Sequence, residues 1–141
     1  MNSTTSIPKG ILFLCVANSA RSQMAEGIAR NIFPETVVIQ SAGVAPAYVH
    51  PLAKEVLSEI DIDISGQTSK SVHDIDPDSV DLVITLCAEQ VCPSFLGKAK
   101  KLHWPLPNPD AGNELEALRK FRAIRDDLVG RLEELKLSLG E

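Results

Sequence analysis

The chain has 141 residues and a net charge of −5 at pH 7, and 44% of its residues are hydrophobic and 23% charged. This length predicts one domain, and the acidic balance excludes nucleic acid as a general partner. No apolar run approaches the ~18 residues of a membrane-spanning helix, and the first residues lack the basic start of a signal peptide. We therefore expect a cytoplasmic monomer with a flexible lead at residues 1–9 and a single α/β domain at residues 10–141.

The first predicted strand runs directly into a short loop and a helix. Residues 10–15 are apolar and end in Cys15, residues 16–20 are small or polar, and helical spacing follows over residues 21–33. Five residues thus separate Cys15 from Arg21. Small side chains allow the loop to curl so that its backbone N–H groups point toward an anion, next to the positive end of the helix.

This arrangement predicts a site for a tetrahedral oxyanion beside a reactive cysteine. Arg21 can donate two hydrogen bonds to two oxygens of the anion, and the same positive field favours the thiolate of Cys15, to which Ser22 can hydrogen-bond. The predicted oxyanion-binding residues are Val16, Ala17, Asn18, Ser19, Ala20, Arg21 and Ser22. A buried strand-end thiol and a solvated arginine would show the same spacing, but the strand, small loop and helix around them favour the site.

A second strand and a second helix follow. Residues 36–40, which are β-branched except for Gln40, predict a strand that runs into Ser41-Ala42-Gly43, and Pro51 opens a helix with apolar spacing as far as Ile60. Residues 65–78 are polar, which predicts a loop. The three histidines, His50, His73 and His103, show no spacing typical of a catalytic triad, so we interpret them as structural or surface residues.

The other two cysteines follow the third predicted strand, at residues 80–86. Cys87 ends this strand, and Cys92 precedes Pro93. Adjacent parallel strands lie about 4.8 Å apart, so a modest loop movement could bring Cys87 to Cys15, although strand-end cysteines are also often inert core thiols. An odd number of cysteines makes no disulfide framework, and Cys87 and Cys92 lack a second ligand pair with metal-site spacing. We expect reduced thiols and no metal.

A short strand at residues 101–104, a proline-rich loop at 105–109 and a helix at 113–139 complete the chain. The helix carries one apolar stripe of Leu115, Leu118, Phe121, Ile124, Leu128, Leu132 and Leu135. Strands that alternate with helices predict an α/β fold with a parallel sheet covered on both faces. Ligands of such sheets bind beyond the carboxyl ends of the strands, so Cys15, Cys87 and the proline loop should meet there.

The segment Cys-Val-Ala-Asn-Ser-Ala-Arg-Ser-Gln-Met-Ala-Glu, from Cys15 to Glu26, resembles the signature of the low-molecular-weight protein tyrosine phosphatase superfamily. Its continuation through Gly27 resembles the arsenate reductase branch. Further resemblance lies in Ser41-Ala42-Gly43, Asp63-Ile64-Ser65, Gln67-Thr68-Ser69, Thr85-Leu86-Cys87, Cys92-Pro93 and Asn108-Pro109. The resemblance implies a single-domain, four-stranded parallel sheet of order 2-1-3-4 flanked by helices, and a thioredoxin-coupled arsenate reductase.

The resemblance also implies a relay of three cysteines that needs no metal or organic cofactor. Cys15 attacks arsenate, and Cys87 attacks Cys15, so that arsenite leaves and a disulfide forms. Cys92 then moves the disulfide outward for thioredoxin to reduce. A glutathione- or mycothiol-type thiol is the alternative to thioredoxin as the reductant. Two alternatives to the reductase function also stay open, a low-molecular-weight phosphatase and a non-catalytic oxyanion-binding or redox-sensing module.

Two positions depart from the family pattern. Asn108 stands where the phosphatases and most related reductases have an aspartate, and an amide cannot donate the proton that a carboxylic acid gives to a leaving oxygen. It is either a contributor to the site or a simple turn residue. Lys70 stands where some related reductases have an aspartate that binds potassium together with Asn18, Glu26 and Ser41. Its ammonium is either a substitute for the ion or a solvated surface group.

Overall fold

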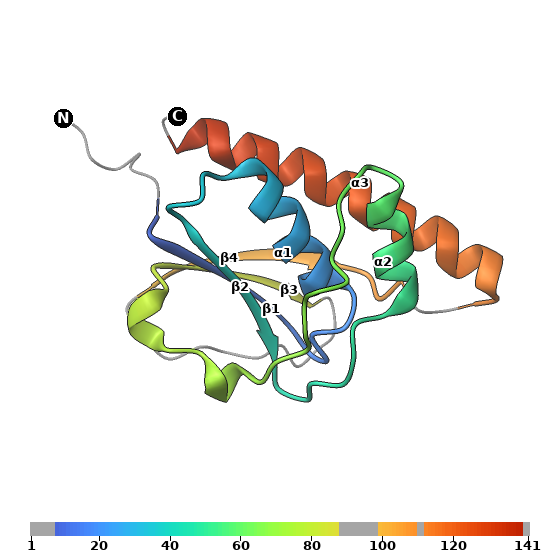
Figure 1. Ribbon diagram of the computed structural model, residues 1–141, viewed down its shortest axis with the longest axis horizontal. Helices are drawn as coiled ribbons and strands as arrows, with labels where there is room; N and C mark the ends of the chain where they lie inside the picture. Colours follow the sequence, from blue (N-terminus) through green and yellow to red (C-terminus); the bar gives the residue numbers. More distant parts are fainter. Residues whose placement is uncertain (1–7, 88–98, 110–111, 140–141) are drawn as a thin grey trace.

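The computed structural model describes residues 8–87, 99–109 and 112–139. Four parallel strands form one sheet in the order β2-β1-β3-β4 (Figure 1). The strands are β1 (Gly10–Cys15), β2 (Val38–Gly43), β3 (Leu82–Cys87) and β4 (Lys100–Leu106). The predicted α/β class and the strand order implied by the resemblance are confirmed.

Three α-helices share one face of this sheet. They are α1 (Arg21–Ile32), α2 (Pro51–Ser58) and α3 (Glu114–Ser138). Helix α1 contacts β1, β2, α2 and α3 and so lies at the centre of this layer (Figure 1). Ile11 and Phe13 of β1 point into the core beneath it, because alternate side chains of a strand face the same side.

The opposite face carries a smaller apolar cluster, formed by Leu12, Leu14, Ala42, Ile75, Val80 and Val83. Ile75 and Val80 come from a segment with two short 3-10 helices, η2 (Val72–Asp74) and η3 (Pro77–Ser79). The prediction of a loop at 65–78 missed these turns, which begin where Ser71 and Asp76 accept hydrogen bonds from backbone N–H groups two residues ahead. Both faces are covered as predicted, with the described α-helices on one of them.

Helix α3 begins with a capping box. The side chain of Asn113 accepts a hydrogen bond from the Glu116 backbone (2.9 Å), and the Glu116 carboxylate accepts one from the Asn113 backbone (3.1 Å).

The predicted apolar stripe of α3 is wrong at Leu115, which is 57% exposed. Leu115 precedes the buried Ala117 by two residues, and two residues turn about 200° around a helix. Within the described residues, no helix has the length and hydrophobicity to cross a membrane.

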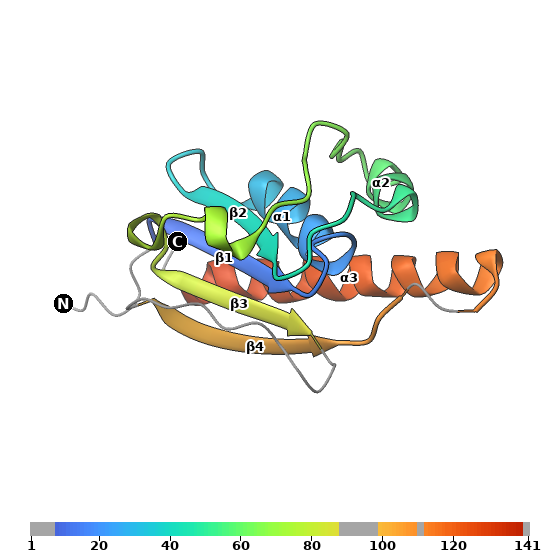
Figure 2. The same cartoon turned by 90° about the horizontal axis from the view of Figure 1, so that it is seen from below.

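Strand β3 ends at Cys87, as predicted. Strand β4 is longer than predicted, because it continues through Pro105 to Leu106. Proline is tolerated there because β4 lies at the edge of the described sheet, where a strand can lack a ladder N–H. Figure 2 shows β3 and β4 side by side, with their arrowheads at the same end of the molecule as the connection from β1 to α1.

Candidate active site

A cavity of about 210 Å³ lies at the carboxyl end of β1. It is lined by Cys15, Val16, Ala17, Ser19, Ala20, Arg21, His50 and Asn108. Cys15 is 2% exposed and Arg21 6%, so both functional groups are withdrawn from bulk water. The loop, its cysteine and its arginine therefore surround one space, as the sequence predicted.

The N-terminus of α1 adds donors to this space. Its N-cap residue is Ala20, and no side chain in the described part of the chain caps it. The first N–H groups of a helix have no partner within the helix and carry the positive end of its dipole. Because Ser19, Ala20 and Arg21 line the cavity, an anion bound there would lie at the positive end of this helix.

The guanidinium of Arg21 is held by the end of β4. Its Nη1 donates to the backbone oxygen of Leu106 at 2.9 Å. A guanidinium has five N–H donors in a rigid plane, so a bond to Leu106 orients the rest of the group. Arg21 thus approaches the cavity as an anchored side chain. Its two-oxygen clamp on an anion stays a prediction.

Asn18 connects the loop to three other segments. Its side-chain nitrogen donates to Ser22 Oγ (2.8 Å) and Ser41 Oγ (2.9 Å), and its side-chain oxygen accepts from the backbone nitrogen of Lys70 (2.7 Å) and from Gln23 Nε2 (3.0 Å). The side chain is fully buried. Neither Asn18 nor Ser22 is among the described residues that line the cavity, so their place in it stays a prediction; both act in the network behind the loop.

Ser22 confirms one predicted contact, because its Oγ lies 2.9 Å from Cys15 Sγ. The same oxygen accepts a hydrogen bond from Asn18. A hydroxyl has one donor and two acceptor sites, so Ser22 can accept from Asn18 and still donate its proton to the sulfur. Asn18 thus positions the Ser22 hydroxyl beside Cys15.

The back of the loop is packed against β2 and the segment after α2. A Cβ at Gly43 would collide with Val16 O and would lie 2.8 Å from Cys15 O, so only glycine fits there. Ser69 Oγ donates to Ala17 O at 3.0 Å. Sequence reasoning assigned no role to Ser69 or Gln23, because their bonds to the loop arise from pairing between distant segments and leave no local pattern.

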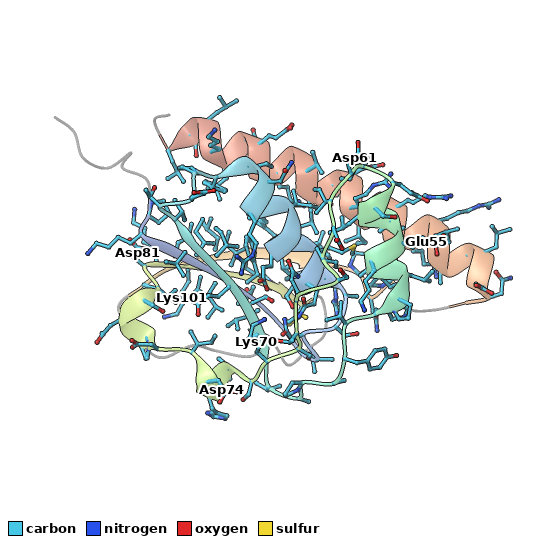
Figure 3. The ribbon with its side chains drawn as sticks, viewed as in Figure 1. Glu55, Asp61, Lys70, Asp74, Asp81 and Lys101 are labelled. Carbon is cyan, nitrogen blue, oxygen red and sulfur yellow. The ribbon has the colours of Figure 1, made fainter. Side chains whose placement is uncertain are left out.

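Lys70 is labelled in Figure 3. Its ammonium lies beside a buried carboxylate. Its Nζ lies 3.5 Å from Oε1 of Glu26, whose side chain is 3% exposed, and donates to Thr68 O at 2.7 Å. Ser41 donates to the same Glu26 oxygen, and Arg30 binds the other one at 2.7 Å. A larger cavity of about 540 Å³ opens beside Glu26 and Lys70, but Cys15 does not line it, so we place the chemistry in the smaller one.

Cys87 lies close to the same end of the sheet. It is 1% exposed, and it pairs across the sheet with Leu106, the residue that holds Arg21. Strands β1 and β3 are neighbours, and Leu14 pairs with Thr85, so the carboxyl ends that carry Cys15 and Cys87 are adjacent. Both residues are thiols in this structure. Cys92 lies outside the described residues.

Residues 10–141 match the family described as low molecular weight phosphotyrosine protein phosphatase. The chain belongs to this family. The arsenate reductase of Staphylococcus xylosus is 42% identical over 131 residues, which cover 92% of this chain and 97% of that protein. The glutaredoxin arsenate reductase of Synechocystis sp. is 36% identical over 129 residues, which cover 90% of this chain and 95% of that protein.

Solved structures within the family agree. One described as an arsenate reductase in the phosphate binding state has a TM-score of 0.81 and 34% identity, with 94% of this chain and 99% of that chain covered. The thioredoxin-dependent arsenate reductase of Corynebacterium glutamicum has a TM-score of 0.71 and 31% identity, with 96% of this chain and 63% of that chain covered. The predicted resemblance to the arsenate reductase branch is confirmed.

Two more residues line the cavity. Asn108, which the sequence allows as either a contributor to the site or a turn residue, is exposed and lines the cavity. His50 also lines the cavity, although we interpreted it as structural or surface from the sequence. No spacing could have revealed His50, because it precedes α2 and reaches the loop only through the fold.

Proposed function

We propose that this chain is an arsenate reductase that uses Cys15, Cys87 and Cys92 as a thiol relay. The observation that carries the proposal is the second buried thiol, Cys87, at the end of the strand next to β1. A phosphatase needs a single nucleophilic cysteine and a way to release an alcohol. A reductase needs a second sulfur that can reach the first, and the position of Cys87 at the end of the neighbouring strand supports that role.

The chemistry follows from thiolate displacement. Cys15 attacks arsenic(V), a sulfur–arsenic bond forms, and an oxygen of arsenate leaves as water after gaining protons. Cys87 then attacks the sulfur of Cys15, the sulfur–arsenic electron pair passes to arsenic, and arsenite, now arsenic(III), leaves behind a Cys15–Cys87 disulfide. Cys92 attacks Cys87 and frees Cys15, and an external dithiol reduces the Cys87–Cys92 disulfide. In this proposal Arg21 and the backbone N–H groups of the loop hold the oxyanion until arsenite leaves.

The external reductant is a dithiol protein of the thioredoxin class in this proposal. The named thioredoxin-dependent relative supports it, while the glutaredoxin-named relative makes glutathione the alternative to test. A relay that must return to free thiols after each turnover fits the cytoplasm, where thiols are kept reduced. We therefore place the protein there.

The deciding experiment compares two reactions of the same preparation. Arsenite release from arsenate is measured with thioredoxin, thioredoxin reductase and NADPH, and nitrophenol release is measured from p-nitrophenyl phosphate. We expect sustained arsenite release and at most weak phosphatase activity, and Cys15→Ser should abolish both because an alcohol is not ionised in this loop. Phosphatase activity without arsenate reduction would overturn the proposal. Absence of both would favour a binding or redox-sensing module.

The relay itself is tested with Cys92→Ser. This variant should complete about one turnover and stop as a Cys15–Cys87 disulfide, which peptide mapping detects. Sustained turnover of the variant with thioredoxin would remove Cys92 from the relay. Sustained turnover with glutathione alone would move the protein to the glutathione-coupled class.

A phosphatase remains the second candidate because the family as a whole bears that name. Asn108 weakens it, since an amide has no proton to give to an aryl leaving group. Asn108→Asp should therefore raise p-nitrophenyl phosphate hydrolysis much more than arsenate reduction, because arsenate brings its own protons. Equal gains in the two kcat/KM values would show that Asn108 has another role.

A further inference from the structure

The oxyanion loop, residues 16–20, is held from outside by its carbonyl groups. Four successive carbonyl oxygens accept hydrogen bonds from other parts of the chain. The pairs are Ala45 N to Val16 O (3.0 Å), Ser69 Oγ to Ala17 O (3.0 Å), Gln23 Nε2 to Asn18 O (3.1 Å) and His50 N to Ser19 O (3.0 Å). Each peptide group of the loop is therefore held by a bond to its oxygen.

A held carbonyl also sets the direction of the N–H group in the same peptide. In a trans peptide the C=O and N–H bonds lie in one plane and point to opposite sides, and no peptide bond among the described residues is cis. The loop oxygens point toward donors outside the loop, so the N–H groups that follow them point the other way. Ala17, Ser19 and Ala20 line the cavity, so the cavity lies on that other side.

Gln23 is a fully buried residue in the first turn of α1, and its amide nitrogen faces three oxygens. Nε2 lies 3.1 Å from Asn18 O, 3.0 Å from Asn18 Oδ1 and 2.9 Å from Thr68 O. Two of these oxygens are backbone carbonyls, which can only accept, so the atom that faces them is the NH2 nitrogen. The Gln23 Oε1 accepts from Gln67 Nε2 at 2.7 Å. Both ends of the amide are thus bonded, and the group cannot turn over without losing these bonds.

The residue that Gln23 binds has an unusual backbone conformation. Asn18 has φ of 49°, in the left-handed region that residues other than glycine rarely adopt. A change of Asn18 to a more common conformation would turn the peptide that joins it to Ser19. Gln23 opposes this change because it binds both the backbone oxygen and the side-chain oxygen of Asn18. The direction of the Ser19 N–H therefore depends on Gln23.

We propose that Gln23 is a positioning residue of the oxyanion site, whose amide holds the Asn18 carbonyl outward and so keeps the Ser19 N–H directed at the anion attacked by Cys15. Gln23 is not among the described residues that line the cavity, so it acts through Ser19. The inference rests on the proposed function only in taking the ligand to be a tetrahedral oxyanion. It applies equally to inorganic phosphate, which can be bound without turnover.

Gln23→Met tests this role. Methionine is a helix former of similar length, so the position in α1 stays filled while the donor to Asn18 and Thr68 is removed. Hydrogen bonds to charged groups are among the stronger ones, so a misdirected Ser19 N–H should raise the Kd for phosphate about tenfold. The Kd is measured by calorimetry at a temperature at which circular dichroism shows the variant to be folded. A merely structural role would lower the melting temperature and leave this Kd unchanged.

Gln40→Met is the matched control. Gln40 lies on β2, and its Nε2 donates to Ser79 Oγ of η3 at 3.1 Å. It is not among the described residues that line the cavity of Cys15, so its loss should leave the phosphate Kd unchanged. An equal rise in both variants would overturn the assignment of Gln23, because the loss of any such bond would then loosen the site.

A measurement on the wild type does not depend on the folding of a variant. In proton–nitrogen NMR, saturation with phosphate should move the backbone amide proton of Ser19 to lower field, because a hydrogen bond to an anion deshields the proton. The side-chain NH2 protons of Gln23 should exchange slowly with solvent with and without phosphate, since their bonds exist before the anion binds. A Ser19 proton that does not move, or Gln23 protons that are protected only after phosphate binds, would overturn the inference.

The outcomes separate the role of Gln23 from the proposed function. If the wild type binds phosphate and Gln23→Met binds it more weakly, but arsenate is not reduced, the proposed function alone is refuted. If arsenate is reduced normally and the phosphate Kd is unchanged in Gln23→Met, the role of Gln23 alone is refuted.

Discussion

Asn18 has a left-handed backbone, with φ of 49°, and its buried side chain joins the loop to β2 and to the segment of Lys70. The two features can be separated, because glycine adopts this conformation without strain and alanine does not. Asn18→Gly should destabilise the fold by about 1–3 kcal/mol through lost hydrogen bonds, and Asn18→Ala by about 1 kcal/mol more. Urea unfolding measures both.

Arsenate reduction by the two Asn18 variants should fall together, because the side chain that supports Ser22 is absent from each. We therefore predict that Asn18→Gly and Asn18→Ala differ in stability but lose activity to the same extent. If Asn18→Gly retained full kcat/KM, the network behind the loop would not be needed to position the Cys15–Ser22 pair.

Lys70 makes a second prediction at the scale of the residue. The sequence allows its ammonium to be either a substitute for potassium or a solvated surface group, and the ammonium lies 3.5 Å from the buried carboxylate of Glu26. We propose the first alternative. The wild-type melting temperature and activity should therefore not change when NaCl replaces KCl at constant ionic strength. Lys70→Ala removes the ammonium and should make the melting temperature rise specifically with potassium.

Lys54→Ala, an exposed lysine of α2, is the control for the loss of one positive charge. It should remain insensitive to the choice of cation. A potassium-specific rise in the wild type would mean that the ion binds beside Lys70 and that the lysine is not its substitute.

Among the elements, α2 and α3 are joined by an ion-pair cluster. Glu59, at the C-terminal end of α2, binds Arg122 and Arg125 of α3, each at 2.7 Å. The hydrogen bonds from Arg122 and then Arg125 lower the pKa of Glu59 from 4.5 to about 2. A lowered pKa in the folded state stabilises the protein at pH values above 4.5, and this contribution is lost as the pH falls toward 2.

Glu59→Gln should therefore reduce the free energy of unfolding at pH 6, and the difference from the wild type should shrink as the pH falls from about 5 to 2. Because the pairs lie near the surface, added salt should also reduce the difference. Denaturant unfolding over this pH range is the measurement. Glu55→Gln, on the same helix, controls for the loss of one charge; an equal pH-dependent difference in it would exclude the ion pairs as the cause.

For the molecule as a whole, an inert oxyanion reports how the site is coupled to folding. Inorganic phosphate at a hundred times its Kd should stabilise the native state by about 2.7 kcal/mol and raise the melting temperature by several degrees. Arg21→Lys should lose most of this shift, since a point charge cannot reproduce a planar fork. Lys101→Ala, at an exposed position on β4, should keep it. Equal shifts in both variants would refute the anion clamp.

Parts of the fold that depend on nearby residues could be predicted from the sequence. The strand, loop and helix around Cys15 and Arg21 lie in one continuous stretch, and their periodicity and small residues identify the site. Ser69 and Lys70 lie beside the bridge between Gly43 and Ser71, and His50 donates its backbone N–H to Ser19 O. These contacts join distant segments and leave no periodic signal. The prediction was wrong at Leu115 because this residue is apolar and was added to the apolar stripe of α3, whose first buried residue is Ala117.

The register of β3 against β4 has a consequence for the order of events in catalysis. Pairing is regular from Leu82 to Thr85 and then shifts, so that Cys87 pairs with Leu106 beyond an irregularity. Such interruptions weaken the ladder locally, so the end of β3 can depart without separating the whole strand. If Cys87 joins Cys15 as in the proposed relay, Leu106 would lose that neighbour, and Leu106 is the residue whose backbone oxygen accepts from Arg21. Oxidation would then weaken the support of Arg21 when arsenite is formed, and reduction would restore it before the next arsenate binds.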